Sequence, residues 1–248
     1  MMPVKKAEII AELQASILRL EGFKTLSQGA GHVGLGPVLE VFPNRTFPTG
    51  VIHEFVSSCE EQTAATSGFI AGVVASLMGP QGASLWICPR QTIFPPALKT
   101  FGIQPDSVIF VELQNEIDIL WAMDEALKCP ALTTVIAETN ELTFTASRRL
   151  QLAVERSQVT GFVIRNDGKK INSTAAVARW RITPAESGAI DGLPGIGHPH
   201  WNVELLKVKN GRPGSWNIRW VNSGFESVKI ITADQETETY SGTGRKAG

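Results

Sequence analysis

A strand, a loop and a helix near residue 60 constrain the fold of this chain more than any other feature. Residues 51–78 read VIHEFVSSCEEQTAATSGFIAGVVASLM, in which Val51–Val56 predicts a buried strand and Ala64–Met78 an apolar helix. A phosphate-binding loop of the form G-x-x-x-x-G-K-[ST] would stand between such a strand and helix. The chain has Ser57–Ala64, SSCEEQTA, in its place. The segment therefore predicts a nucleotide-binding type of α/β fold that has lost its nucleotide.

The residues of this loop oppose phosphate binding in three ways. It has no glycine, so its backbone cannot easily wrap a phosphate. Thr63 replaces the lysine, and Ala64 replaces the hydroxyl that would hold magnesium. Negative charge lies where the helix N-terminus would attract a phosphate. We therefore expect that the protein is not an enzyme, has no ATPase activity and binds no cofactor. The residues assigned to the degenerate loop are Ser57, Glu60, Glu61, Gln62, Thr63 and Ala64.

The rest of the chain alternates strand and helix patterns before it changes character. Beyond residue 174 the helical pattern stops, and alternating segments predict antiparallel strands that close one edge of a mostly parallel sheet. We predict three regions: an N-terminal helix (7–20) with a Gly/Pro loop in 1–50, an α/β core in 51–232, and a disordered tail in 233–248. The predicted core strands are 51–56, 83–88, 108–111, 133–137, 161–165, 176–182, 202–209 and 216–221, and the later helices are 96–101, 115–128 and 146–158.

Composition narrows the class of protein. The net charge of −1 gives no bulk attraction to nucleic acid or membrane, and no segment has the roughly 18 continuous apolar residues of a membrane span. Cys59, Cys88 and Cys129 are scattered, which favours a reducing compartment, and each is expected to be a small buried residue. The cytoplasm is the expected location. A metal site is not expected, because His198 and His200 have too few further candidate ligands near them in the sequence. The sequence also shows no motif of a nucleophilic triad.

Charge is segregated along the sequence. Residues 101–147 hold eight acidic residues and one lysine, whereas residues 148–181 hold eight basic and two acidic residues. Such separation is compatible with a dipolar docking surface. The other interpretation is that helices 115–128 and 146–158 are neighbours whose charges pair.

Two further sequence patterns could serve either binding or only the packing of the fold. G-x-G-x-x-G at 29–34 lacks the flanking strand and helix of a dinucleotide site, and predicts a loop. The C-terminal strands interleave rings with bases, a mixture that can bind single-stranded nucleic acid. Strand alternation instead puts Trp216, Ile218 and Trp220 together in the core, with Asn217 and Arg219 on the other face. The candidate DNA-contacting bases are Lys207, Lys209, Arg212 and Arg219.

Three stretches carry a resemblance to a known family. Residues 120–127, LWAMDEAL, resemble W-A-x-E-x-A-L, and residues 148–155, RRLQLAVE, resemble R-R-L-Q-L-A-A-E. Residues 201–214 resemble a W-x-V-E-L…R-G-G-x-P-G ending. In this order, and after the degenerate loop, they resemble the ImuA family, a branch of the RecA-like superfamily found in bacterial mutasome cassettes. The cell-division inhibitor SulA shares the reduced RecA-like core and is the nearest alternative.

The resemblance implies a fold and a role. The fold is a RecA-like three-layer α/β/α domain, in which Glu138 ends the strand that normally supplies a catalytic aspartate. The role is a non-catalytic adaptor in SOS-induced translesion synthesis that binds an ImuB-type Y-family polymerase homologue, with RecA, the error-prone polymerase and a second copy as further partners. Direct DNA contact is left open. The alternative is a SulA-like inhibitor that binds FtsZ.

The interface expected from this role lies on the two charged helices. Trp121 is either a docking anchor or, because Leu120 and Leu127 recur at helical spacing, a core residue. Arg148 and Arg149 are the candidate contacts on the second helix. Helix 7–20 packs on a partner, on a second copy or on its own core.

Overall fold

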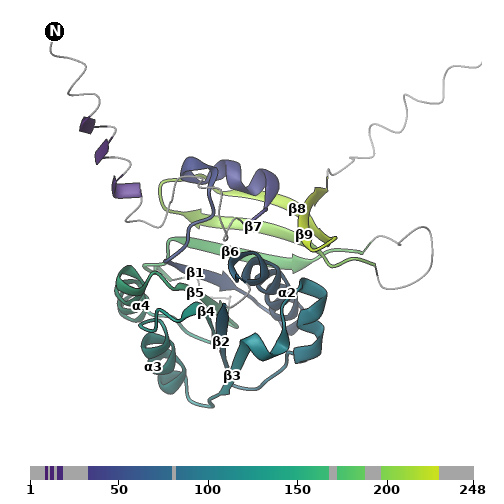
Figure 1. Cartoon of the computed structure of the whole chain (residues 1–248), viewed down its shortest axis with the longest axis horizontal. Coiled ribbons are helices and arrows are strands. Elements are labelled where there is room, and N and C mark those ends of the chain that lie inside the picture. The colour runs from purple at the N-terminus through teal and green to yellow at the C-terminus, as the bar shows by residue number, and fades with distance from the viewer. Residues whose placement is uncertain are drawn as a thin grey trace, which may run out of the picture.

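The described residues form a nine-stranded sheet with helices packed on it (Figure 1). This computed structural model describes residues 33–79, 82–167, 172–187 and 197–228, together with residues 9, 10, 12, 13 and 16–18. The sheet order is β3-β2-β4-β5-β1-β6-β7-β8-β9. The strands are β1 Ile52–Val56, β2 Ala83–Cys88, β3 Val108–Glu112, β4 Leu132–Thr139, β5 Thr160–Arg165, β6 Ala178–Pro184, β7 His200–Val208, β8 Gly214–Val221 and β9 Gly224–Val228. The helices are α2 Glu60–Leu77, α3 Glu116–Ala126 and α4 Phe144–Ser157, with 3-10 turns η1 Gly36–Val41, η2 Pro43–Arg45, η3 Pro95–Phe101 and η4 Pro105–Ser107.

Strand direction divides the sheet into two parts. β3, β2, β4, β5, β1 and β6 are parallel, whereas β7, β8 and β9 are antiparallel. The predicted α/β class with a parallel core and antiparallel C-terminal strands is confirmed. Segment 176–182, predicted to be antiparallel, is antiparallel to β7 but parallel to β1, so β6 is the strand at which the sheet changes from parallel to antiparallel. Alternation of buried and exposed residues reports the two faces of a strand and carries no information on its direction.

The helix starts depend on local capping. α2 begins at Glu60, earlier than the predicted Ala64, and carries Glu60 and Glu61 in its first turn, where acidic side chains interact favourably with the helix dipole. Asn115 caps α3 as predicted, because its side chain accepts a hydrogen bond from the Ile117 amide at 3.1 Å. Thr143 caps α4 in the same way, so this helix begins at Phe144.

The sheet separates two hydrophobic clusters. One lies on the α2 side and is centred on Phe55, Phe69 and Trp180, and the other lies under α3 and α4 around Ile52 and Met123. Helices therefore cover opposite faces of the parallel strands (Figure 1). The Gly/Pro stretch 22–50 was expected to be irregular, yet its described part contains η1 and η2 and contributes buried residues to the first cluster: Val33, Leu35, Val38, Leu39, Phe42 and Phe47.

Several predictions concern residues near the two ends of the chain. Residues 9, 10, 12, 13 and 16–18 are helical, as predicted for 7–20; Leu18 packs against the α2-side cluster and Leu13 is exposed. Residues 29–32 and the tail 233–248 lie outside the described residues. Among described residues, no helix combines the length and apolar character needed to cross a bilayer.

Two of the three cysteines correct the prediction of burial. Cys88 is buried in β2, but Cys59 and Cys129 are exposed. Cys59 occupies the N-cap of α2, and Cys129 follows α3 in a turn, and both places face the surface. Small apolar side chains at such loop positions need no burial.

His53 is a core residue whose two ring nitrogens are both engaged. It lies in β1, fully buried, and stacks on Phe47 with ring centroids 4.5 Å apart. Its Nε2–H donates to the Pro48 carbonyl at 2.9 Å, and its Nδ1 accepts the indole N–H of Trp180 at 3.2 Å. This pairing fixes the neutral tautomer. Burial lowers the pKa of His53 from 6.5 to about 4, against a smaller opposing contribution from the Pro48 hydrogen bond.

We therefore expect the protein to lose stability as the pH falls below neutrality. The unfolded chain protonates this histidine below pH 6.5 and the folded protein only near pH 4, so the unfolded state holds more protons in that window. His53 alone should remove about 2 kcal/mol from the free energy of unfolding between pH 7 and pH 5. Urea denaturation at the two pH values, for wild type and His53→Gln, measures this. Equal losses in both proteins would contradict the assignment.

Candidate functional site

The residues of the degenerate loop lie at the carboxyl ends of four neighbouring strands. β1 leads into 57–59, β2 into Pro89 and Arg90, β4 ends beside Glu138, and β5 leads into Asn166. The connection after β1, through α2, covers one face of the sheet, whereas the connections before and after β4, through α3 and α4, cover the other. This edge is therefore a topological switch point, the place where open α/β sheets bind ligands. A cavity of about 670 Å³ opens there, within the range of small-molecule sites.

The loop between β1 and α2 directs its polar groups to the protein itself. The Ser57 amide donates to the Arg165 carbonyl at 2.8 Å, and the Ser58 amide donates to the Gln62 side chain at 2.9 Å. The Thr63 hydroxyl donates to Asn166 at 3.0 Å. The amide hydrogens of Ser57 and Ser58 are thus already in use.

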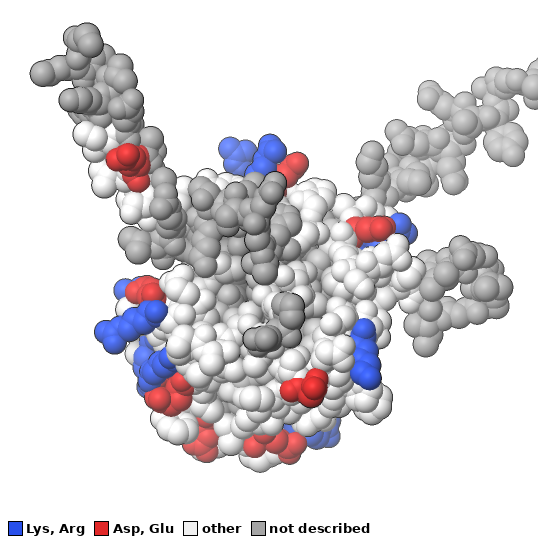
Figure 2. All heavy atoms as spheres, in the orientation of Figure 1, with Lys and Arg blue, Asp and Glu red and all other residues white. Residues whose placement is uncertain are grey.

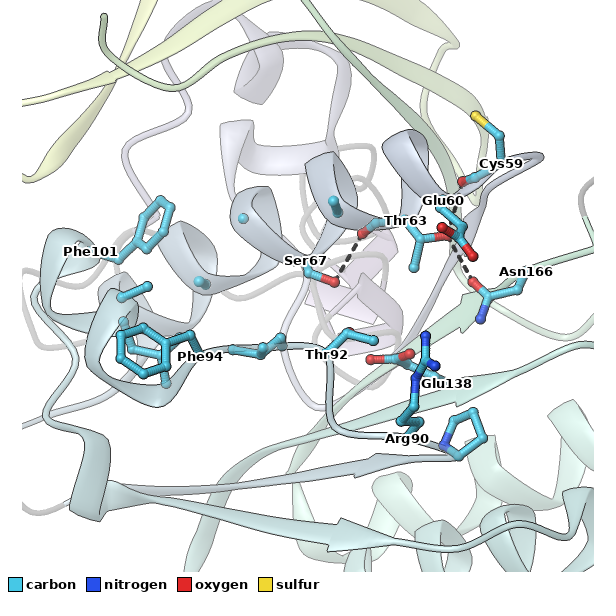
Figure 3. A pocket seen from close by; sticks show the side chains of 17 residues that line it. Cys59, Glu60, Thr63, Ser67, Arg90, Thr92, Phe94, Phe101, Glu138 and Asn166 are labelled. Carbon is cyan, nitrogen blue, oxygen red and sulfur yellow. Dashed lines mark hydrogen bonds between the residues drawn. The ribbon is translucent and has the colours of Figure 1, made fainter. Parts of the chain in front are cut away.

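Glu138 lies at the base of the cavity. It is only 4% exposed, and one carboxylate oxygen accepts the indole N–H of Trp86 at 2.9 Å. Burial raises the pKa of Glu138, and the Trp86 hydrogen bond offsets only part of that effect. In Figure 3, Glu138, Arg90 and Asn166 lie at one end of the cavity and Phe94 and Phe101 at the other.

The structure brings together part of the predicted loop set and adds a wall that the sequence did not indicate. Glu60, Thr63, Ala64 and Glu138 line the cavity, whereas Ser57, Glu61 and Gln62 do not. The added wall is formed by η3 and the residues before it. A helix was predicted at 96–101, where η3 lies, but the sequence did not indicate that this helix would face α2. The residues of this wall are Ile93, Phe94, Ala97, Leu98 and Phe101.

A second, shallower site lies between α3 and α4. This α3–α4 groove has a volume of about 240 Å³ and is lined by Ile117, Leu120, Trp121, Asp124, Ala146, Arg149 and Leu150. Trp121 is 60% exposed, so the interpretation of Trp121 as a core residue is wrong. Buried Ile119 and Met123 hold α3 to the sheet instead. An exposed tryptophan beside an apolar groove is typical of an interaction surface.

Charges on α3 and α4 pair across the groove. Asp124 is buried and receives the Arg149 guanidinium at 2.9 Å and the Lys128 ammonium at 3.0 Å. Burial disfavours the charged form of Asp124, but the hydrogen bonds from Arg149 and Lys128 outweigh it and lower its pKa. Figure 2 shows blue and red side chains next to each other over α4 and α3, at the lower left. The neighbouring-helix interpretation therefore holds for these residues, while Arg148 and most of Arg149 remain exposed.

The C-terminal bases lie on strands whose rings face the core. Ile218 and Trp220 are buried, and Trp216 packs against the same cluster. Arg219 lies on the other face and pairs with Glu226 at 2.9 Å, and Lys207 donates to the Thr174 carbonyl at 3.1 Å. Arg212 is exposed on the β7–β8 connection, next to Lys209. Direct DNA contact by these residues stays a prediction.

Among the described residues, no three histidine, cysteine or carboxylate side chains gather in a way that could hold an ion. The Nδ1–H of His200 donates a hydrogen bond to the Glu186 carbonyl at 2.7 Å.

Comparison with known proteins finds relatives of two kinds. Protein ImuA of Caulobacter vibrioides, from two strains, is 33% identical over 195 residues, which cover 74% of this chain and 80% of that protein. The cell division inhibitor SulA of Yersinia pestis and of Yersinia pseudotuberculosis is 31% identical over 123 residues, which cover 49% of this chain and 72% of those proteins. No family model matches the chain.

Proposed function

This chain belongs to the ImuA family, and from that premise we propose that it is a non-catalytic adaptor in SOS-induced translesion DNA synthesis. In this role it binds an ImuB-type Y-family polymerase homologue in the cytoplasm, and also contacts the error-prone polymerase and RecA. The observation that carries the proposal is the α3–α4 groove with exposed Trp121 in a chain of this family.

The site at the carboxyl ends of the strands supports a role without ATP hydrolysis. Phosphoryl transfer needs a lysine on the phosphates, a magnesium ligand and a carboxylate that orients water. Thr63 and Ala64 stand at the first two positions. Glu60 adds a full negative charge to the cavity, which exceeds the roughly half charge of the α2 N-terminus. One oxygen of the Glu138 carboxylate already accepts the Trp86 indole N–H.

The α3–α4 groove supports docking of a protein. Trp121 and Ile117 present apolar surface on successive turns of α3, and Arg149 presents a partly exposed cation on the facing helix. Aromatic and arginine side chains dominate binding hot spots. The partner surface that fits has an apolar side chain for the groove and a carboxylate for Arg148 or Arg149.

The second candidate function is inhibition of cell division through FtsZ, which the similarity to SulA over about half of the chain favours. A paired pull-down separates the two. The purified chain is mixed with the Y-family homologue and, separately, with FtsZ of the same organism, at moderate salt and without nucleotide. Retention of the homologue alone supports the adaptor. Retention of FtsZ alone overturns it and makes the chain a division inhibitor.

A further inference from the structure

The cavity at the carboxyl ends of β1, β2, β4 and β5 has an apolar body. Small residues of α2, among them Ala64, Gly68 and Ala71, form one wall, and the aromatic and aliphatic side chains around η3 form the other. Phe94 and Phe101 lie at the end away from Glu138 (Figure 3). A ligand that enters here buries apolar surface along most of its length.

The end of the cavity away from Phe94 and Phe101 carries a carboxylate that has no cationic partner among the described residues. Glu138 lines the cavity, and the one hydrogen bond that it accepts from the described residues comes from Trp86. A carboxylate has about four acceptor positions, so capacity remains for a further donor. Among the described residues, no lysine or arginine forms an ion pair with Glu138; Arg90 lines the same cavity without doing so.

Charge around the cavity favours a cation over an anion. Two carboxylates, those of Glu60 and Glu138, line the cavity together with one guanidinium, that of Arg90. The α2 N-terminus contributes only about half a positive charge. An anionic ligand would also meet amide hydrogens that already donate to Arg165 and Gln62.

We propose that this cavity is a binding site for a protonated amine or guanidinium carried on a short apolar or aromatic stem. The charged group bonds to the free oxygen of Glu138, and the stem lies between α2 and η3. A small organic amine and a lysine or arginine side chain of a bound protein share this chemistry. The proposal is independent of the adaptor role.

The test uses the indole N–H of Trp86 as a reporter, because it is bonded directly to Glu138. Benzylamine, benzyl alcohol and benzoate are titrated into the ¹⁵N-labelled full chain, and the Trp86 signal is assigned with Trp86→Phe. We expect benzylamine to shift this signal in a saturable way and to bind about tenfold more tightly than benzyl alcohol, as for a hydrogen bond to a charged group. Benzoate should not bind.

Matched variants locate the effect. Glu138→Gln should bring the affinity for benzylamine close to that for benzyl alcohol. Glu112→Gln, the same substitution at a carboxylate that does not line the cavity, should leave the preference intact. Arg90→Gln should strengthen benzylamine binding, because it removes a like charge from the site. Tight binding of benzoate, a Trp86 signal that benzylamine does not move, or an unchanged preference in Glu138→Gln would each overturn the proposal.

A last titration identifies the source of the cation. Benzylamine is titrated by calorimetry into the preformed complex with the Y-family homologue. Loss of binding assigns the site to a partner side chain, and unchanged binding assigns it to a small molecule. If the chain binds benzylamine but no homologue, the adaptor role fails and the cation site stands.

Discussion

Glu54→Gln should lower the free energy of unfolding by about 3–5 kcal/mol, the range for breaking a buried ion pair by removal of one partner. Glu54 is fully buried in β1 and accepts hydrogen bonds from Arg165 at 2.8 Å and from Arg179 at 2.9 Å. Thr174 donates to the same carboxylate at 2.5 Å. Glutamine keeps the volume but removes the negative charge that pairs with two buried guanidinium groups, those of Arg165 on β5 and Arg179 on β6. The cluster joins the three central strands, so the loss should appear as a shift of the whole urea transition.

Glu226→Gln is the matched control. It breaks the pair with Arg219, in which both side chains are nearly half exposed, and such surface pairs contribute about 0–1 kcal/mol. If Glu54→Gln costs no more than Glu226→Gln, the buried cluster does not stabilise the sheet as described.

Trp121→Ala should weaken binding of the Y-family homologue by about thirtyfold or more, which corresponds to the 2 kcal/mol that defines a hot spot. The same substitution should change the free energy of unfolding little, because 60% of the side chain is exposed. Titration calorimetry gives the first quantity and urea denaturation the second.

Ile109→Ala is the matched control for Trp121→Ala. Ile109 is also exposed, at 52%, but it lies on the edge strand β3 and does not line the α3–α4 groove. Its replacement should leave the affinity unchanged. Wild-type affinity in Trp121→Ala would show that the homologue docks on another surface.

The pattern of hydrophobic residues predicted most of the fold, and the physical limits of such patterns explain the elements that were not predicted correctly. Buried strands such as β2 and helices such as α3 were placed within a few residues, because burial imposes a period that the sequence must carry. β9 was missed, because GFESV is short and only partly buried. The parallel pairing of β6 with β1 was not predicted, because pairing direction depends on the connection that follows β5.

The candidate sites were only partly predictable for a related reason. The degenerate loop was predicted from residue types that the phosphate chemistry requires, and Glu60 and Glu138 of the predicted set line one cavity. The helical spacing of Leu120 and Leu127 favoured a core position for Trp121. In the structure, Ile119 and Met123 occupy the face of α3 that packs on the sheet. A helix was predicted at 96–101, where η3 lies, but a short helical segment does not indicate which element it packs against, so only the three-dimensional structure shows that Phe94 and Phe101 face α2.

The central claim is an adaptor that works without nucleotide, and one measurement tests it most directly. The purified full chain is titrated with the Y-family homologue of the same organism, once without nucleotide and once with millimolar ATP and magnesium, and the two dissociation constants are compared. We predict binding in both conditions with the same affinity, because the loop at 57–64 lacks the lysine and the magnesium-binding hydroxyl that ATP binding requires. Binding that requires ATP, or no binding in either condition, would contradict the account.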